Sequence, residues 1–122
     1  MKLMHIVLAA LLIKSTIAIA DPIGVAGAGD RSCAEIAKFF RQNPDQTSVI
    51  VFSWAQGYMS GLNVAGGASG REVRDLSGMT TKDEESAIQN YCEEHPMSDL
   101  ATAVMDLYKT LPTAKLPDFL RK

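Results

Sequence analysis

The amino-acid sequence predicts an all-α fold, a small single-domain bundle of about four helices with one disulfide bond. Three observations predict it. Apolar residues recur at spacings of three and four in four segments, which is typical of amphipathic helices. Serine, threonine or aspartate precedes these segments, and proline or glycine follows them. The only two cysteines, Cys33 and Cys92, lie far apart in the chain.

Residues 1–20 have the layout of a secretory signal peptide. Lys2 supplies the positive start, residues 6–13 are an unbroken apolar run, and the tripeptide AIA at 18–20 matches an A-x-A cleavage site. Lys14 interrupts the region after the apolar run, so an uncleaved anchor is the alternative. We expect a periplasmic protein with no membrane segment after cleavage, because no later stretch approaches eighteen apolar residues.

The mature chain is expected to be acidic. Removing residues 1–20 takes away two of the 12 basic residues and none of the 14 acidic ones, which changes the net charge from −2 to −4. The sequence has no basic patch for nucleic acid and no polybasic stretch for anionic lipid. The remaining 102 of the 122 residues suffice for one domain with a modest core.

Cys33 and Cys92 both belong to the exported part. In an oxidising compartment such a pair most simply forms one intramolecular disulfide, and two free thiols are the alternative. The disulfide would close a loop of about 60 residues, for which the chain-entropy estimate is ~4 kcal/mol as an upper figure. That is a large share of the ~5–10 kcal/mol expected for a domain of this size.

The first helix is predicted within residues 32–42. Residues 21–31, rich in glycine, alanine and proline, are predicted to be a flexible arm. Ser32 and Glu35 then match a capping box, and Asn43-Pro44 is a stop signal.

The second helix is predicted to begin near Thr47 or Ser48 and to end toward Gly66-Gly67. Its apolar stripe consists of Val51, Trp54, Ala55, Tyr58 and Leu62. Residues 49–52 alone could form a β-strand, but the continuing helical period favours a helix. Residues 64–79 are predicted to be a loop.

The third and fourth helices complete the helical domain, residues 32–112. Thr81 to Glu84 match a second capping box, and His95-Pro96 ends the third helix. Ser98 or Asp99 caps the fourth helix, which Pro112 closes. Residues 113–122 are predicted to be a tail. The disulfide would join the start of the first helix to the end of the third.

The segment SWAQGYMSGLN, residues 53–63, is the candidate binding surface. It contains Trp54, Tyr58 and Met59, with Gly57 and Gly61 four residues apart. Each glycine inside a helix costs ~1 kcal/mol relative to alanine. One explanation is close packing within the domain. The other is a homodimer interface or a surface that binds client proteins, because a small domain cannot cover every large apolar side chain.

No residue pattern indicates catalysis, so we expect a protein that is not an enzyme and needs no cofactor or metal. His95, the only histidine outside the signal peptide, is best explained as a helix-terminal residue. Ser60 does not stand in a G-x-S-x-G motif, and residues 66–70 lack the lysine of a phosphate-binding loop. Residues 83–85 are best explained as an acidic first helical turn.

Two segments carry a family resemblance. SCAEIAKFF (32–40) and IQNYCEEHPMSDL (88–100) resemble the two cysteine segments of the HdeA/HdeB family of small periplasmic acid-stress chaperones, with residues 51–58 at the place of that family's tryptophan-containing helix. The resemblance covers roughly residues 32–110. It implies a helical domain with a Cys33–Cys92 disulfide. It also implies apolar surface that is buried in a homodimer at neutral pH and released in acid to hold unfolded clients.

The sequence departs from that family in its glycine-rich segment 64–79 and in lacking a lysine-rich tail. GYMSG, residues 57–61, is also similar to the Tai-type periplasmic immunity proteins, which inhibit cell-wall amidases, but the cysteine expected near that motif is absent. The expected function is therefore that of an exported binding protein of the HdeA/HdeB kind. The alternatives are an immunity protein that binds one effector and an exported helical protein of another role.

Overall fold

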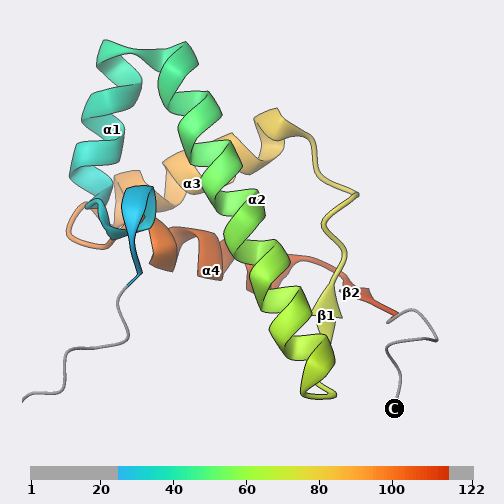
Figure 1. Cartoon of the computed structure of the whole chain (residues 1–122). Helices are drawn as coiled ribbons and strands as arrows, with labels where there is room; N and C mark the ends of the chain where they lie inside the picture. Colours follow the sequence, from blue (N-terminus) through green and yellow to red (C-terminus); the bar gives the residue numbers. More distant parts are fainter. Residues whose placement is uncertain (1–24, 116–122) are drawn as a thin grey trace, which may run out of the picture.

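The computed structural model describes residues 25–115 and confirms the all-α prediction. Four helices make up most of the described chain (Figure 1): α1 (Cys33–Gln42), α2 (Pro44–Ala68), α3 (Thr81–Glu94) and α4 (Leu100–Thr110). The smaller elements are a 3-10 helix, η1 (Gly27–Asp30), and two short strands, β1 (Val73–Arg74) and β2 (Thr113–Ala114). The predicted signal peptide and residues 116–122 of the predicted tail lie outside the described residues.

Helix α1 begins and ends where the sequence predicts. The Ser32 hydroxyl accepts a hydrogen bond from the Glu35 N–H at 3.2 Å, and the Glu35 carboxylate accepts one from the Ser32 N–H at 3.0 Å. These two bonds are the predicted capping box, and they satisfy amides that have no partner within the helix.

Helix α2 begins at Pro44, so the prediction of a start near Thr47 or Ser48 is wrong. Proline is well suited to the first position of a helix, because it has no N–H to leave unpaired and its φ is already helical. The Asn43-Pro44 pair therefore ends one helix and opens the next. Figure 1 shows α2 as the long diagonal element that crosses the front of the molecule.

The N-caps of the last two helices refine the predictions. Thr80, one residue earlier than predicted, caps α3 by accepting a hydrogen bond from the Asp83 N–H at 3.1 Å. Asp99, rather than Ser98, caps α4 by accepting one from the Thr102 N–H at 2.7 Å.

The predicted disulfide is present, and Cys33 and Cys92 are both buried. It joins the first residue of α1 to the last turn of α3, as predicted. Around it lies one core to which all four helices contribute. Its larger buried side chains are Ile36, Val51, Met59, Ile88, Leu100, Val104, Leu107 and Leu111.

Two segments predicted to be irregular contain regular structure. Residues 27–30 of the predicted flexible arm form η1, which packs against α2 and α4. Residues 64–68 of the predicted loop continue α2, and residues 73–74 form β1. Strand β1 pairs antiparallel with β2 in the predicted tail, with Val73 opposite Ala114.

Asn63 explains why this strand pair forms beside α2. Its side-chain amide donates to the Arg74 carbonyl and accepts from the Arg74 N–H, each at 2.8 Å. The same Asn63 oxygen accepts from the Tyr108 hydroxyl at 2.7 Å. One side chain of α2 therefore fixes β1 and α4 at once.

Among the described helices, none combines the length and apolar content that a membrane crossing needs.

Candidate functional site

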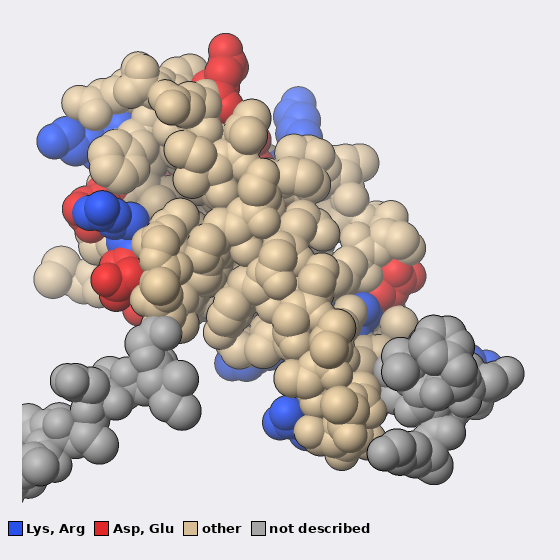
Figure 2. Space-filling model, viewed as in Figure 1, with Lys and Arg blue, Asp and Glu red and all other residues tan. Residues whose placement is uncertain are grey.

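The exposed side of α2 is uncharged along almost its whole length. Asp45, in the first turn, is the only charged residue among the 25 of this helix. The exposed residues beyond that turn recur every three or four positions and define the α2 face: Val49, Ile50, Ser53, Gly57, Ser60, Gly61, Val64, Ala65 and Ala68. Figure 2 shows the surface over α2 as a continuous uncharged band, with lysine, arginine and acidic side chains at its margins.

Large apolar side chains project from the α2 face. Val64 is 74% exposed, Val49 is 65% exposed and Ile50 is 49% exposed. Single exposed apolar residues are common on proteins, but an apolar, charge-free surface that extends along a helix is typical of an interaction site. The face is therefore suited to contact with another apolar surface.

The middle of the α2 face is a shallow hollow. It is lined by Ser53, Trp54, Gly57, Tyr58, Gly61 and Leu62. The rings of Trp54 and Tyr58 stack with their centroids 4.9 Å apart and their planes 17° from parallel, and both side chains are half-buried. The hollow thus has an aromatic wall beside two residues that lack side chains.

Gly57 and Gly61 are not needed for packing inside the described part of the chain. Apart from its own chain neighbours and the adjacent backbone of α2, a Cβ at either position would meet no atom within 4 Å. The structure therefore provides no close intramolecular approach to explain two glycines in the middle of a helix. Their effect is to deepen the hollow beside Trp54 and Tyr58.

Met59 does not belong to this surface in the folded protein, which agrees with the packing alternative for this residue. Its side chain is buried in the core, on the side of α2 that carries Val51 and Ala55. The regular spacing of four residues places Val51, Ala55 and Met59 inward. Trp54 and Tyr58 lie at the edge between the buried and the exposed sides of the helix.

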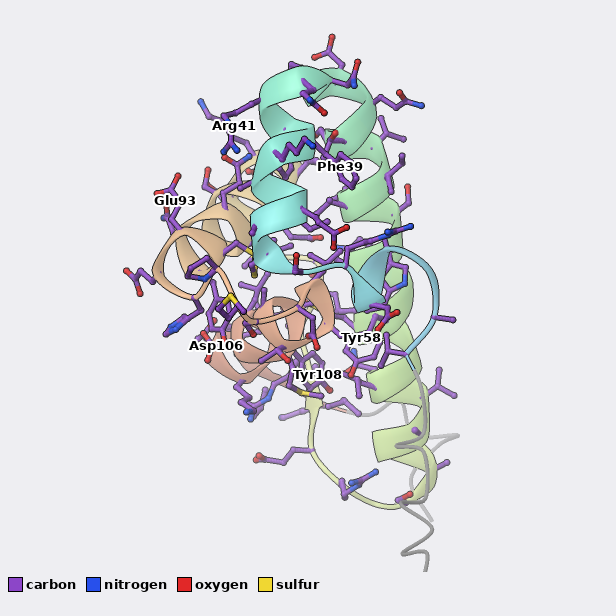
Figure 3. The ribbon with its side chains drawn as sticks, turned by 90° about the vertical axis from the view of Figure 1, so that its left-hand side faces the viewer. Phe39, Arg41, Tyr58, Glu93, Asp106 and Tyr108 are labelled. Carbon is purple, nitrogen blue, oxygen red and sulfur yellow. A yellow bond between two sulfur atoms is a disulfide. The ribbon has the colours of Figure 1, made fainter. Side chains whose placement is uncertain are left out.

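Trp54 is held in place by the segment that precedes α1. Its indole N–H donates to the Ala26 carbonyl at 3.1 Å. Gly29 is buried against the indole ring so closely that a Cβ there would overlap the ring atoms. Figure 3 shows η1 lying against α2 beside Tyr58. These contacts were not predicted, and the Gly-Ala-Gly stretch at 27–29 is their only signal in the sequence.

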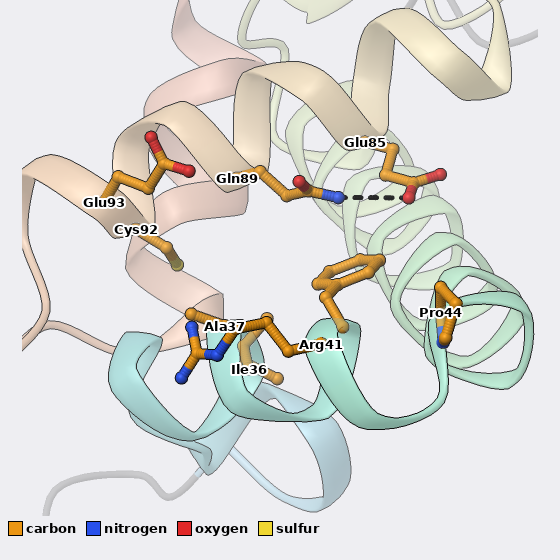
Figure 4. A pocket seen from close by; sticks show the side chains of 9 residues that line it. Ile36, Ala37, Arg41, Pro44, Glu85, Gln89, Cys92 and Glu93 are labelled. Atoms are coloured by element: carbon orange, nitrogen blue, oxygen red, sulfur yellow. Dashed lines mark hydrogen bonds between the residues drawn. The ribbon is translucent and has the colours of Figure 1, made fainter.

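Two further cavities flank the start of α2. One, of about 610 Å³, lies between η1, α1 and α2, and Phe39 and Ile50 are on its wall. The other, of about 380 Å³, lies between α1 and α3 (Figure 4). Ile36 and Cys92 line the second cavity together with the charged residues Arg41 and Glu93.

The residues considered for catalysis are not brought together. His95 caps the C-terminus of α3, where its ring contacts that of Tyr91 at a centroid distance of 4.5 Å. Ser60 is exposed on α2. Within residues 25–115, no group of three or more histidine, cysteine or acidic side chains is arranged to hold a metal ion.

The first turn of α3 is acidic, as predicted, and contains Asp83 and Glu84. Glu84 is buried, and burial raises the pKa of its carboxyl, with the hydrogen bond from Gln56 acting in the opposite direction. The helical period indicates that Glu84 is buried, because Glu84 lies four and eight residues before the buried Ile88 and Cys92.

Comparison of the chain with protein-family models, with curated proteins and with solved structures finds no match.

Proposed function

We propose that this protein is an exported helical binding protein that engages other proteins through the α2 face. The observation that supports this proposal is the combination of exposed Val49, Ile50 and Val64 with the absence of any charge between them. Charged groups are costly to desolvate, so a partner's apolar surface can cover such a face without leaving a charge unpaired. The disulfide fits an oxidising compartment.

The specific form that we propose first is an acid-stress chaperone, as the resemblance to the HdeA/HdeB family implies. Protonation of all 14 acidic groups would change the mature chain from a net charge of −4 to about +10, or +11 with His95 charged. Such a charge loosens a compact state by self-repulsion, while the disulfide limits how far the chain expands. At neutral pH, a second copy of the chain could cover the same face.

The alternative is a dedicated inhibitor of the immunity-protein kind. It is favoured by the turn at residues 69–72, which is exposed at the end of α2. Asn63 forms two hydrogen bonds to the backbone of Arg74, just beyond this turn. The end of the turn is therefore anchored to α2. A folded inhibitor would insert such a turn into the cleft of one partner at neutral pH.

Light scattering of an unrelated client separates these functions. The mature protein would be mixed with unfolding alcohol dehydrogenase at neutral pH and at about pH 3, where carboxylates are protonated. Trp54 emission, recorded in parallel, reports on the hollow, since Trp54 is the only tryptophan. A chaperone suppresses aggregation in acid, with a red shift of the emission. An inhibitor suppresses it at neither pH.

A charge on the α2 face tests the surface itself. Val64→Lys is chosen because lysine stays charged in acid, and Val64 is 74% exposed, so folding should be unaffected. The control is Asn90→Lys, which adds the same charge at an exposed position of α3. We expect Val64→Lys alone to weaken client binding and any self-association. If both variants bind like the wild type, the α2 face is not the binding surface.

A further inference from the structure

Glu84 is a buried acid at the contact between α3 and α2. Glu84 is 1% exposed, which places it among the most buried side chains of the domain. One carboxyl oxygen, Oε2, accepts a hydrogen bond from the side-chain amide of Gln56 on α2. The other, Oε1, is buried with no hydrogen-bond partner.

This environment suits a neutral carboxylic acid better than a carboxylate. A carboxylate removed from water needs its oxygens paired or a nearby positive charge, and Glu84 has a single neutral donor. A protonated carboxyl has no charge to desolvate and can still accept from Gln56 through its carbonyl oxygen. The position of Glu84 in the first turn of α3 favours the ionised form, since a helix N-terminus attracts negative charge.

Within residues 25–115, no positive side chain forms an ion pair with Glu84. The helices packed against α3 are α1, α2 and α4. The ionisable groups of these three helices are Glu35, Lys38 and Arg41 on α1, Asp45 and Tyr58 on α2, and Asp106, Tyr108 and Lys109 on α4. Besides Glu84, α3 itself carries Lys82, Asp83, Glu85, Tyr91, Glu93 and Glu94, with His95 at its end. Arg74 and Asp75 precede α3 in the chain. Within residues 25–115, the one ion pair is Arg31–Glu35, which is remote from Glu84 in the chain.

We propose that Glu84 is a proton-dependent clamp, through which acidification strengthens the contact between α3 and α2. Burial raises the pKa of Glu84, and the Gln56 hydrogen bond offsets only part of this rise. Because the folded-state pKa lies above that of the unfolded chain, the stabilising effect of the proton is complete below the ordinary glutamate pKa. It is lost as the pH rises through the folded-state value.

The direction is opposite to that of ordinary acid denaturation, in which protonation removes stabilising carboxylates. If the α2 face is the binding surface, the clamp keeps the helix that bears it attached to α3 in acid. This consequence rests on the proposed function, whereas the clamp itself does not.

The test is the melting temperature of the mature, oxidised protein as a function of pH, for wild type and Glu84→Gln. Glutamine has the shape of glutamate and no charge, so it mimics the protonated clamp. We expect Glu84→Gln to melt roughly 4–8 °C above wild type at neutral pH. This difference should shrink toward zero as the pH falls below about 4, where the wild type is itself protonated.

Glu93→Gln is the control, because it removes the same charge from the same helix at an exposed position. It should show no gain that depends on pH in this way. A Glu84→Gln difference that is constant across the pH range, or a loss at neutral pH, would overturn the proposal.

A direct titration keeps the proposal testable if the variant folds poorly. The carboxyl resonance of Glu84 in the wild type, followed by NMR, should titrate above those of the exposed glutamates. Gln56→Leu removes the donor that favours the ionised form, and it should move the Glu84 midpoint further upward. A Glu84 midpoint at or below those of the exposed glutamates would refute the clamp, and it would leave the Val64→Lys test of the α2 face unaffected.

Discussion

The indole ring of Trp54 lies directly on the backbone of Gly29, with no room between them for a side chain at position 29. This contact, with the hydrogen bond from the indole N–H to the Ala26 carbonyl, fixes η1 on α2. It also decides how much of Trp54 the hollow in the α2 face presents. The segment before the first long helix is therefore part of the candidate site.

Gly29→Ala should displace either η1 or Trp54. We expect a loss of about 1–3 kcal/mol, the usual cost of forcing a methyl group into a packed site. Trp54 emission should shift to the red in the native state, and a urea titration gives the change in unfolding free energy. An unchanged emission spectrum together with unchanged stability would show that η1 does not cover Trp54 in solution.

Gly57→Ala and Gly61→Ala should have the opposite effect on stability. Each position is helical, and a Cβ there meets nothing within 4 Å beyond the adjacent backbone of α2, so alanine should raise the unfolding free energy by ~1 kcal/mol. The same methyl groups would partly fill the hollow beside Trp54 and Tyr58 and so weaken partner binding. These variants also serve as the matched glycine-to-alanine control for Gly29→Ala. Destabilisation by either one would indicate a close approach that the described residues do not contain.

Asn63→Ala should release the strand pair from α2. It removes both side-chain bonds to Arg74 and the acceptor of the Tyr108 hydroxyl, and unpaired part-buried groups cost about 1–3 kcal/mol. Hydrogen exchange at the Arg74 amide should accelerate well beyond the change in global stability. Asn90→Ala, at an exposed position on α3, is the control and should leave this exchange rate unchanged.

Glu35 should make the start of α1 sensitive to acid. Hydrogen bonds from the Ser32 backbone and hydroxyl, with a smaller effect of Arg31, lower the pKa of Glu35. A lowered folded-state pKa gives stability that is present above the ordinary value and is lost as the pH falls through the folded-state value. The midpoint urea concentration of the wild type should therefore decrease when the pH is lowered below about 4. The midpoint of Glu35→Gln should decrease less. Parallel curves for the two proteins would contradict this assignment.

Removal of the disulfide should cost up to ~4 kcal/mol, because it frees a loop of 59 residues in the unfolded chain. We expect dithiothreitol to lower the melting temperature of the wild type. It should have no effect on the double variant Cys33→Ala, Cys92→Ala, which already lacks the crosslink. If reductant leaves the wild type unchanged, the two cysteines are not bonded in solution.

The sequence by itself determined the helices and the disulfide bond. Helix positions follow from local features, namely the spacing of apolar residues and the caps at Ser32 and Asp99, whose hydrogen bonds reach only three residues along the chain. The pairing of Cys33 with Cys92 required only that two cysteines share an oxidising compartment. The predicted starts of α2 and α3 differ from the observed ones by only a few residues, at Pro44 and Thr80. At both places, more than one nearby residue has the local features of a helix start.

Tertiary structure alone decided which sides of the helices are used. Trp54 and Met59 belong to the same predicted surface, yet Met59 is in the core and Trp54 lies at its edge. The 3-10 helix over Trp54, the strand pair held by Asn63 and the burial of Glu84 opposite Gln56 all join residues at least eleven positions apart. The helical period is consistent with the burial of Glu84, but it does not indicate Gln56 as the partner. The pairing of residues in all three contacts leaves little trace in periodicity or capping, because it depends on how the helices pack rather than on how each helix forms.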